Sequence, residues 1–564
     1  MGASSDTIPA AVGLEGRTVR ARGDSYLWEW SAETDVFRIA DREGRTMVSG
    51  LLQPAVTVLR PESRENVCSA GRPESCSVED ETLSVRYEGV NGEAALALTL
   101  RFDSDCVWLE PLTYETASAE DVVSVHCHAR ATGRGAMPSL AHTYLVQPGI
   151  CESSALSPVL PTMIFRAGLT TWLGRGSTGS DYEVFQQWGL PAHYFCGITL
   201  TSEPCAAGAL TTHRSDAFCC GLAALPNADY LLRLEDGLGS PMLDVRSDLW
   251  GQARGPGRLT FGERFVWTFA RTYREAVRRY YLKLVDAGIV QVKRNSPAKN
   301  AVVTAAQFNT WGAQCADDHM LSRFDQPFLE SLYEDLRASG MRPRLFVIDD
   351  KWEGSYGRLE HDPARFPEFE QFLDRVRADG LKVGLWAAFL RTDDPRTIGL
   401  DDRHLLHDRA GRPLVERNKF QPYFLLDVSQ SDVQSALRER IRAFAERYRP
   451  DLVKFDFGYE LPSLSVSAPA DRAFAGERFL ECALGLIVDA LRSVSPEIAV
   501  MYYSLSPLVV SHIDLHSPDD LFLCAGDYDL EANRRFFFSG LLGDLGMPTY
   551  GSGGYDWSSM RQIW

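Results

Sequence analysis

The sequence of 564 residues contains no run of about 18 apolar residues, which is the length that a helix needs to cross a bilayer. Its first residues, Met1-Gly-Ala-Ser-Ser-Asp, also lack the basic and apolar regions of a signal peptide. We therefore expect a cytoplasmic protein without a membrane partner. A secreted form from which a signal has been removed remains the alternative.

Basic residues are too few to balance the acidic ones, and the formal net charge is −18. A strongly acidic chain is repelled by nucleic acid, so a nucleic-acid partner is not expected. The 12 cysteines include no C-x-x-C pair and no Cys/His set with zinc spacing. We therefore expect neither a metal nor another cofactor. Cys68 and Cys76 are close enough in sequence to pair, but free buried thiols are the preferred interpretation.

The first half of the chain consists of short segments in which apolar and polar residues alternate, separated by Gly, Pro, Asn and Asp. Leu96, Leu98 and Leu100, for example, alternate with small or polar residues. Such a pattern predicts strands with one buried face, and many of them in succession predict a large antiparallel β-sandwich. We assign this domain to residues 1–260. A helical pattern between Gly262 and Ala287 indicates a helical linker, assigned to residues 261–300.

From residue 301 to residue 564 strand-like and helix-like segments alternate, which predicts a parallel sheet with helical crossovers and hence a (β/α)8 TIM-type barrel. Only six or seven strands can be counted instead of eight. Either one strand escapes recognition or the sequence ends before the barrel closes. The candidate strands are Val302–Phe308, Arg344–Ile348, Lys382–Phe389, Leu452–Phe457, Ile498–Tyr503, Leu521–Cys524 and Pro548–Ser552.

The fourth candidate strand carries Lys454 and Asp456 near its end. Residues two apart in a strand share a face, so both point to one side while Phe455 points to the other. If Phe455 packs under helices, the polar pair faces the barrel interior at the carboxyl ends of the strands, where barrel enzymes have their active sites. A neighbouring ammonium favours an ionised carboxylate, as a nucleophile requires. A structural ion pair is the alternative for such a motif.

The other strand ends also carry polar or aromatic residues, and these residue types suit a sugar. Carboxylates and ammonium groups bind hydroxyls, and aromatic rings cover the apolar faces of sugars. No glycine-rich loop follows these strands, which argues against a sugar phosphate. We expect substrate binding by Asp349, Asp350, Lys454, Ser504 and Asp529, with Trp311, Trp352 and Trp386 as platforms.

Two aspartates are candidates for the chemistry of glycoside hydrolysis, which needs one ionised and one protonated carboxyl group. Asp456, near Lys454, suits the nucleophile, and Asp527 suits the acid if an apolar setting raises its pKa. Asp527 could instead be a helix N-cap, since aspartate is favoured there. Glu460 is the rival nucleophile, but the strand frame favours Asp456.

These motifs, taken in order, resemble glycoside hydrolase family 36, the microbial and plant α-galactosidases. The resemblance implies retaining hydrolysis of terminal α-galactosides without a metal, with Asp456 as nucleophile and Asp527 as acid/base. It also implies that Asp349, Asp350 and Lys454 bind hydroxyls. The family often forms oligomers, so a homo-oligomer is expected. The motifs are Asn309-Thr-Trp, Asp349-Asp-Lys-Trp, Gly380-Leu-Lys-Val-Gly-Leu-Trp, Leu426-Asp-Val-Ser and Lys454-Phe-Asp.

The sequence departs from the family pattern at sites of substrate contact. Trp386 is followed by Ala-Ala-Phe-Leu-Arg where the family has an aromatic residue and Glu-Pro-Glu, and Tyr502-Tyr-Ser-Leu-Ser replaces a Cys-Ser-Gly-Gly-Gly segment. An arginine that often precedes the acid/base is also absent. The reaction type is thus better supported than the sugar. An α-glucosidase or α-xylosidase related to family 31, a transglycosylase and a carbohydrate-binding homologue with weak catalysis remain alternatives.

Overall fold

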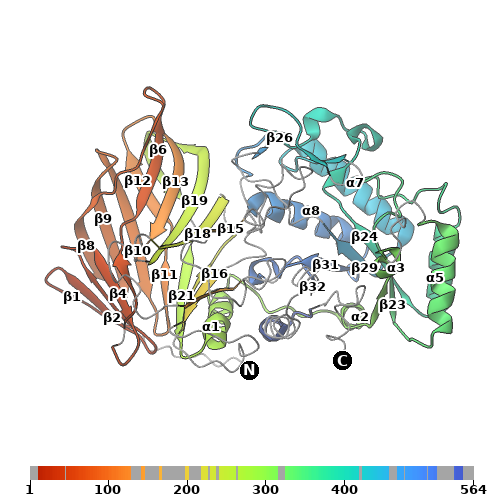
Figure 1. Cartoon of the computed structure of the whole chain (residues 1–564), viewed down its shortest axis with the longest axis horizontal. Coiled ribbons are helices and arrows are strands. Elements are labelled where there is room, and N and C mark those ends of the chain that lie inside the picture. The colour runs from red at the N-terminus through yellow and green to blue at the C-terminus, as the bar shows by residue number, and fades with distance from the viewer. Residues whose placement is uncertain are drawn as a thin grey trace.

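The computed structural model describes residues 10–44, 46–128, 142–146, 164–167, 197–201, 217–225, 229–236, 241–261, 264–315, 324–417, 422–456, 467–474, 477–504, 506–517 and 539–549. Within these ranges an antiparallel part precedes a part built on a parallel sheet, and Figure 1 shows the two side by side. Cys68, Cys76, Cys106 and Cys482 are free thiols.

The antiparallel part contains three sheets that share one hydrophobic core. Strand β10 (Ala94–Phe102) shows the residue pattern on which these sheets are built. Leu96, Leu98 and Leu100 are fully buried, as the alternation predicts, while the residues between them are less buried. The first sheet is the meander β1 (Ala11–Glu15), β2 (Thr18–Arg22), β3 (Leu27–Ser31), β4 (Val36–Ala40) and β5 (Thr46–Leu51).

The two larger sheets carry most of the strands of this part. The ten-stranded sheet holds β14 (His142–Val146), β16 (Gly197–Thr201), β17 (Ala217–Leu222), β21 (Phe265–Ala270), β11 (Cys106–Leu109), β10 (Ala94–Phe102), β12 (Leu112–Thr116) and β20 (Gly257–Phe261), with β9 (Thr82–Val90) beside β10 and β8 (Arg72–Glu79) beside β9. The six-stranded sheet runs in the order β15 (Ile164–Ala167), β18 (Asp229–Asp236), β19 (Pro241–Arg254), β13 (Asp121–His128), β6 (Ala55–Arg60) and β7 (Glu65–Val67).

Helix α1 (Tyr273–Asp286) follows β21 and packs on β17 and β21. The Thr272 hydroxyl caps its first turn by accepting a hydrogen bond from the Glu275 amide at 3.1 Å, as threonine does at this position. The helical pattern expected from Gly262 therefore begins later than predicted, because Phe265–Ala270 pairs as a strand with β11 and β17.

The second part is built on a curled sheet of six parallel strands within the described residues, and their spatial order follows their order in the chain. Four strands lie where the sequence predicted them. The first is shorter than predicted, because Val302 and Val303 belong to helix α2 (Pro297–Val303). The last is a strand that the sequence did not predict. The strands are β22 (Gln307–Asn309), β23 (Leu345–Ile348), β24 (Lys382–Ala387), β29 (Leu452–Phe455), β31 (Ala499–Tyr503) and β32 (Leu515–Ser517). The predicted strand at 521–524 lies outside the described residues.

The two faces of the parallel sheet have different partners. Phe346, Val453 and Phe455 point to one face and join a core that four helices cover. These helices are α5 (Gln326–Ala338), α6 (Phe369–Ala378), α7 (Ser431–Tyr448) and α8 (Glu477–Val494). Val347 and Leu452 point to the other face and pack with helix α2. Lys454, two residues after Leu452, shares this second face, as the period of two predicts.

The helices and short strands of this part complete the list of elements. The helices are α2 (Pro297–Val303), α3 (Trp311–Cys315), α5 (Gln326–Ala338), α6 (Phe369–Ala378), α7 (Ser431–Tyr448) and α8 (Glu477–Val494), and the short 3-10 helices are η3 (Pro395–Ile398), η4 (Asp402–His404) and η5 (Pro507–Val509). Small antiparallel pairings join β25 (Arg391–Thr392), β28 (Pro422–Leu425) and β27 (Val415–Arg417), and also β26 (His407–Asp408) and β30 (Ser467–Ala468). Over the residues that the structure describes, none of the helices combines the length and apolar character that spanning a membrane requires.

Candidate functional site

The candidate site lies where neighbouring parallel strands end. Because these strands are parallel, their carboxyl ends meet at one edge of the sheet. Asn309 ends β22, Asp349 and Asp350 follow β23, Trp386 lies near the end of β24, and Lys454 and Asp456 lie at the end of β29. The structure thus brings together residues that are up to about 150 positions apart in the chain.

Asp349 and Lys454 form a buried ion pair at this edge. The Lys454 ammonium donates to Asp349 Oδ2 at 2.8 Å, and 8% and 3% of the two side chains, lysine first, are exposed. The Asn309 amide donates to the same oxygen at 2.7 Å, and the Asp350 backbone N–H donates to the other oxygen at 2.9 Å. Removal from water is costly for both charges, and the pairing and the additional hydrogen bonds offset this cost. The arrangement fixes a carboxylate and an ammonium side by side.

Asp456 is half-buried, and neighbouring strand β24 holds it at two points. The Trp386 indole N–H donates to Asp456 Oδ2 at 2.8 Å, and the Asp456 backbone N–H donates to the carbonyl oxygen of Ala387 at 3.0 Å. Asp456 follows Lys454 by two positions, so the two share a face at the end of β29. This carboxylate is positioned and partly accessible, as a nucleophile must be.

Asp350 binds a tyrosine that the sequence did not single out. The Tyr356 hydroxyl lies 3.0 and 2.8 Å from the two oxygens of Asp350, and the Lys351 ammonium lies 3.6 Å from Asp350 Oδ2. Burial raises the pKa of Asp350, although Lys351 and Tyr356 counteract the shift. Burial also lowers the pKa of Lys351.

Lys351 has a positive φ of 74°, a region that non-glycine residues seldom occupy. Such backbone strain persists where surrounding contacts compensate for it, and it is common at functional sites. The lysine ammonium lies 4.3 Å from the centre of the Tyr356 ring as well as near Asp350. These contacts help to compensate for the strain.

The predicted aromatic platforms differ in their exposure. Trp311 is half-buried at the start of α3, where its backbone N–H donates to the Asn309 side chain at 2.8 Å. Trp352 is completely buried and stacks on Phe369 with ring centres 5.5 Å apart. The expectation that Trp352 forms a platform is therefore wrong, because its ring belongs to the core. Trp386 is 1% exposed and offers almost no surface to a ligand.

Ser504 also offers no surface to a ligand. It is completely buried, and its hydroxyl oxygen accepts a hydrogen bond from the Ser506 backbone N–H at 3.1 Å. The expected contact of Ser504 with substrate is therefore corrected to a structural role after β31. Asp527, Asp529 and the rival nucleophile Glu460 lie outside the described residues, so the predicted acid/base and these two carboxylates stay predictions.

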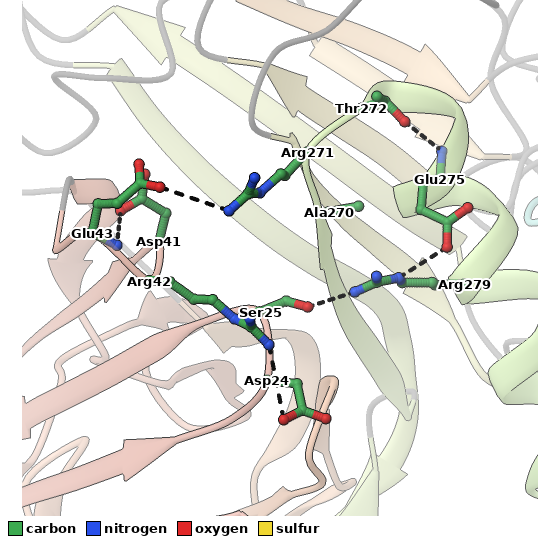
Figure 2. A pocket seen from close by; sticks show the side chains of 10 residues that line it. All are labelled: Asp24, Ser25, Asp41, Arg42, Glu43, Ala270, Arg271, Thr272, Glu275 and Arg279. Atoms are coloured by element: carbon green, nitrogen blue, oxygen red, sulfur yellow. Dashed lines mark hydrogen bonds and ion pairs between the residues drawn. The ribbon is translucent and has the colours of Figure 1, made fainter.

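A pocket of roughly 300 Å³ lies elsewhere, at the junction of the first sheet, the end of β21 and the start of α1 (Figure 2). Its charged side chains bind one another: Arg279 donates to Ser25 at 2.6 Å and to Glu275 at 3.2 Å, and Arg271 lies 3.7 Å from Glu43. These charges are paired with each other, so the pocket resembles a solvated gap between elements. None of the predicted site residues line it. Within the described residues no three His, Cys, Asp or Glu side chains are grouped so that they could hold a metal ion.

Tyr356 and Lys351 are the contacts that sequence reasoning missed. Both lie in the loop after β23, where the sequence has no helical or strand periodicity from which a contact could be predicted. Lys351 stands between Asp350 and Trp352 in a segment that the sequence analysis used, but its backbone conformation had no signal in the sequence.

Comparison with known proteins relates this geometry to solved structures. No protein-family model and no curated protein sequence matches the chain. An α-galactosidase from Lactobacillus brevis matches with a TM-score of 0.54 at 12% identity, over 94% of this chain and 75% of that one. A family 36 α-galactosidase from Geobacillus stearothermophilus in complex with raffinose matches with a TM-score of 0.55 at 14% identity, over 94% and 77%.

The chain has the fold of the family 36 α-galactosidases. The likeness expected from the strand-end motifs is thus confirmed at the level of the fold. A family 31 sulfoquinovosidase from E. rectale, in complex with an aza-sugar inhibitor, matches with a TM-score of 0.56 at 8% identity, over 96% of this chain and 73% of that one. The fold of this chain is therefore also similar to that of a family 31 enzyme.

Proposed function

We propose that this chain is a retaining α-glycosidase that removes terminal, non-reducing α-linked sugars, with an α-galactoside as the expected substrate. The observation that carries the proposal is Asp456: a half-buried carboxylate at the end of a parallel strand, held by Trp386 and close in sequence to the buried pair of Lys454 and Asp349. The fold supports the proposal, because the α-galactosidases described above share it.

In the proposed reaction Asp456 attacks the anomeric carbon while Asp527 donates a proton to the departing oxygen, so the glycosidic bond breaks and an ester to Asp456 forms. Asp527 then takes a proton from water as the water oxygen attacks the anomeric carbon, which breaks the bond from this carbon to Asp456 and frees the carboxylate. Two inversions leave the sugar with its original α configuration. Asp349 and Lys454 bind hydroxyls of the sugar, and the half-buried Trp311 covers an apolar face of it.

The choice of galactose rests on the neighbours, of which two are α-galactosidases in complex with raffinose or stachyose. An α-glycosidase with another sugar is the second candidate, and the match to the family 31 sulfoquinovosidase favours it. We also propose that the six described parallel strands belong to a (β/α)8 barrel over residues 301–564. In this proposal the β-sandwich domain, predicted at 1–260, is extended by β21 to Ala270, and the linker predicted at 261–300 is shortened to the residues that follow.

A panel of nitrophenyl α-glycosides tests the activity and the sugar together. We expect the protein to release nitrophenol from one member of the panel. The Asp456→Asn variant should fold, because the substitution is nearly isosteric, but it should not hydrolyse this glycoside. Asp451→Asn is the matched control: Asp451 lies just before the amino end of β29, where it binds Lys382 at 2.9 Å, far along the strand from the site. Slow or absent release from every member, together with tight sugar binding, would favour the carbohydrate-binding alternative.

A further inference from the structure

Trp386 is held in one orientation by its surroundings. It is 1% exposed and packs in a cluster with Tyr356, Ala388 and Tyr423, and its ring centre lies 5.8 Å from that of Tyr356. A large aromatic ring packed on several sides cannot change rotamer without opening a cavity. The direction of the indole N–H is therefore determined by packing.

This N–H is directed at the candidate nucleophile. It donates to Asp456 Oδ2 at 2.8 Å, which is a normal length for a hydrogen bond to a carboxylate. An indole nitrogen is a donor only, so the bond needs no particular protonation state of the tryptophan. Since the Asp456 backbone also donates to Ala387, two consecutive residues of β24 determine where Asp456 lies and how its carboxylate is turned.

The strand that makes these contacts is itself attached to the core. Trp352 donates its indole N–H to the backbone oxygen of Trp386 at 2.9 Å, and the Trp352 ring is nearly parallel to that of Phe369, with an interplanar angle of 3°. The position of Asp456 is thus connected, through Trp386, to side chains that cannot move independently.

We propose that Trp386 is a positioning residue that orients Asp456 for attack, and that it is not a platform for the sugar. This inference rests on the proposed function, because it assigns Trp386 a part in the same reaction. The indole N–H holds one carboxylate oxygen and so determines how the carboxylate faces the anomeric carbon. Orientation of this kind acts on the chemical step, whereas a platform acts mainly on binding.

Two tryptophan-to-phenylalanine variants form a matched pair. Trp386→Phe and Trp30→Phe, the second in β3, each remove one indole N–H that donates to an aspartate from a buried ring, but only the first removes a donor to Asp456. We expect Trp386→Phe to lower kcat by about 10–100-fold with KM little changed, as the loss of a hydrogen bond to a charged group predicts. We expect Trp30→Phe to lower the melting temperature to a similar extent and to keep kcat close to that of the unaltered protein.

The kinetic outcomes separate this inference from the function on which it rests. A raised KM with unchanged kcat in Trp386→Phe would restore the platform role and overturn the inference, and so would equal losses of kcat in the two variants. Either result leaves the glycosidase assignment intact as long as the unaltered protein cleaves a glycoside and Asp456→Asn does not. An unaltered protein that cleaves nothing refutes both.

An NMR measurement tests the hydrogen bond even if Trp386→Phe does not fold. With nitrogen-15 in the indole rings, the chain gives signals from its 12 tryptophans. We expect one indole proton signal to lie downfield in the unaltered protein and to move upfield in Asp456→Ala, because its charged acceptor is removed. A spectrum in which no indole signal responds to Asp456→Ala would overturn the inference.

Discussion

The buried pair of Asp349 and Lys454 makes a prediction that can be worked out from its contacts. Replacing Lys454 with methionine leaves the Asp349 carboxylate buried without its ammonium partner. Breaking a buried ion pair in this way costs about 3–5 kcal/mol of folding free energy. The hydrogen bonds from the Asn309 amide and the Asp350 backbone N–H remain, so we expect a loss near the lower end, about 3 kcal/mol.

A double-mutant cycle isolates the pair from other effects. Asp349→Asn leaves the ammonium buried and should destabilise by a similar amount, whereas the double variant leaves no unpaired charge. We therefore expect a coupling energy of roughly 2–3 kcal/mol, within the range found for residues in contact. Urea unfolding of the whole chain, monitored by tryptophan fluorescence, measures the free energy of unfolding of each variant. The relevant transition is the one whose midpoint the Lys454 substitution shifts.

An exposed pair between β24 and the start of β29 provides the control. Lys382 lies 2.9 Å from Asp451, but half of the Lys382 side chain is exposed. Its replacement by methionine should cost less than about 1 kcal/mol, as is usual for exposed pairs. If the Asp349 and Lys454 substitutions proved additive within about 0.5 kcal/mol, the claim that these residues stabilise each other would fail.

Two further predictions concern the loop after β23. Tyr356→Phe removes the hydroxyl that binds both oxygens of Asp350, so urea unfolding should show a loss of about 1–3 kcal/mol, and an unchanged midpoint would contradict the contact. Burial raises the pKa of Glu353 from 4.5 to about 8, so its contribution to stability is complete below about pH 4.5 and is lost as the pH rises through about 8. Glu353→Gln should therefore melt close to the unaltered protein near pH 5 and above it near pH 9, and parallel melting curves at all pH values would contradict the shift.

Strand faces in this protein follow from simple patterns. The alternation of Leu452, Lys454 and Phe455 placed the apolar ring under the helices and the lysine on the opposite face, as observed. The prediction worked because successive side chains of a strand point to opposite faces, so Lys454 must lie opposite Phe455. The same pattern is ambiguous for a short apolar run. Val302 and Val303 predict a strand, but Ser296 and Pro297 begin a helix that includes both valines.

Tertiary contacts account for the parts of the site that could not be predicted. A tryptophan after a strand can pack outward or line a pocket, and nothing local separates Trp352, which stacks in the core, from Trp311, which is half-buried. The partner of Lys454 was also open, because Asp349 lies 105 positions away in the chain and only the order of the strands brings the two together. Tyr356 reaches Asp350 through the course of a loop, for which the sequence carries no periodic signal.

The identity of the residue that a mechanism-based inhibitor labels would test the whole account most directly. A 2-deoxy-2-fluoro glycosyl fluoride of the sugar chosen from the panel should inactivate the protein and add one sugar to one peptide. The account predicts that fragmentation of this peptide locates the sugar on the carboxylate of Asp456. A label on Glu460 or on any other carboxylate would contradict it.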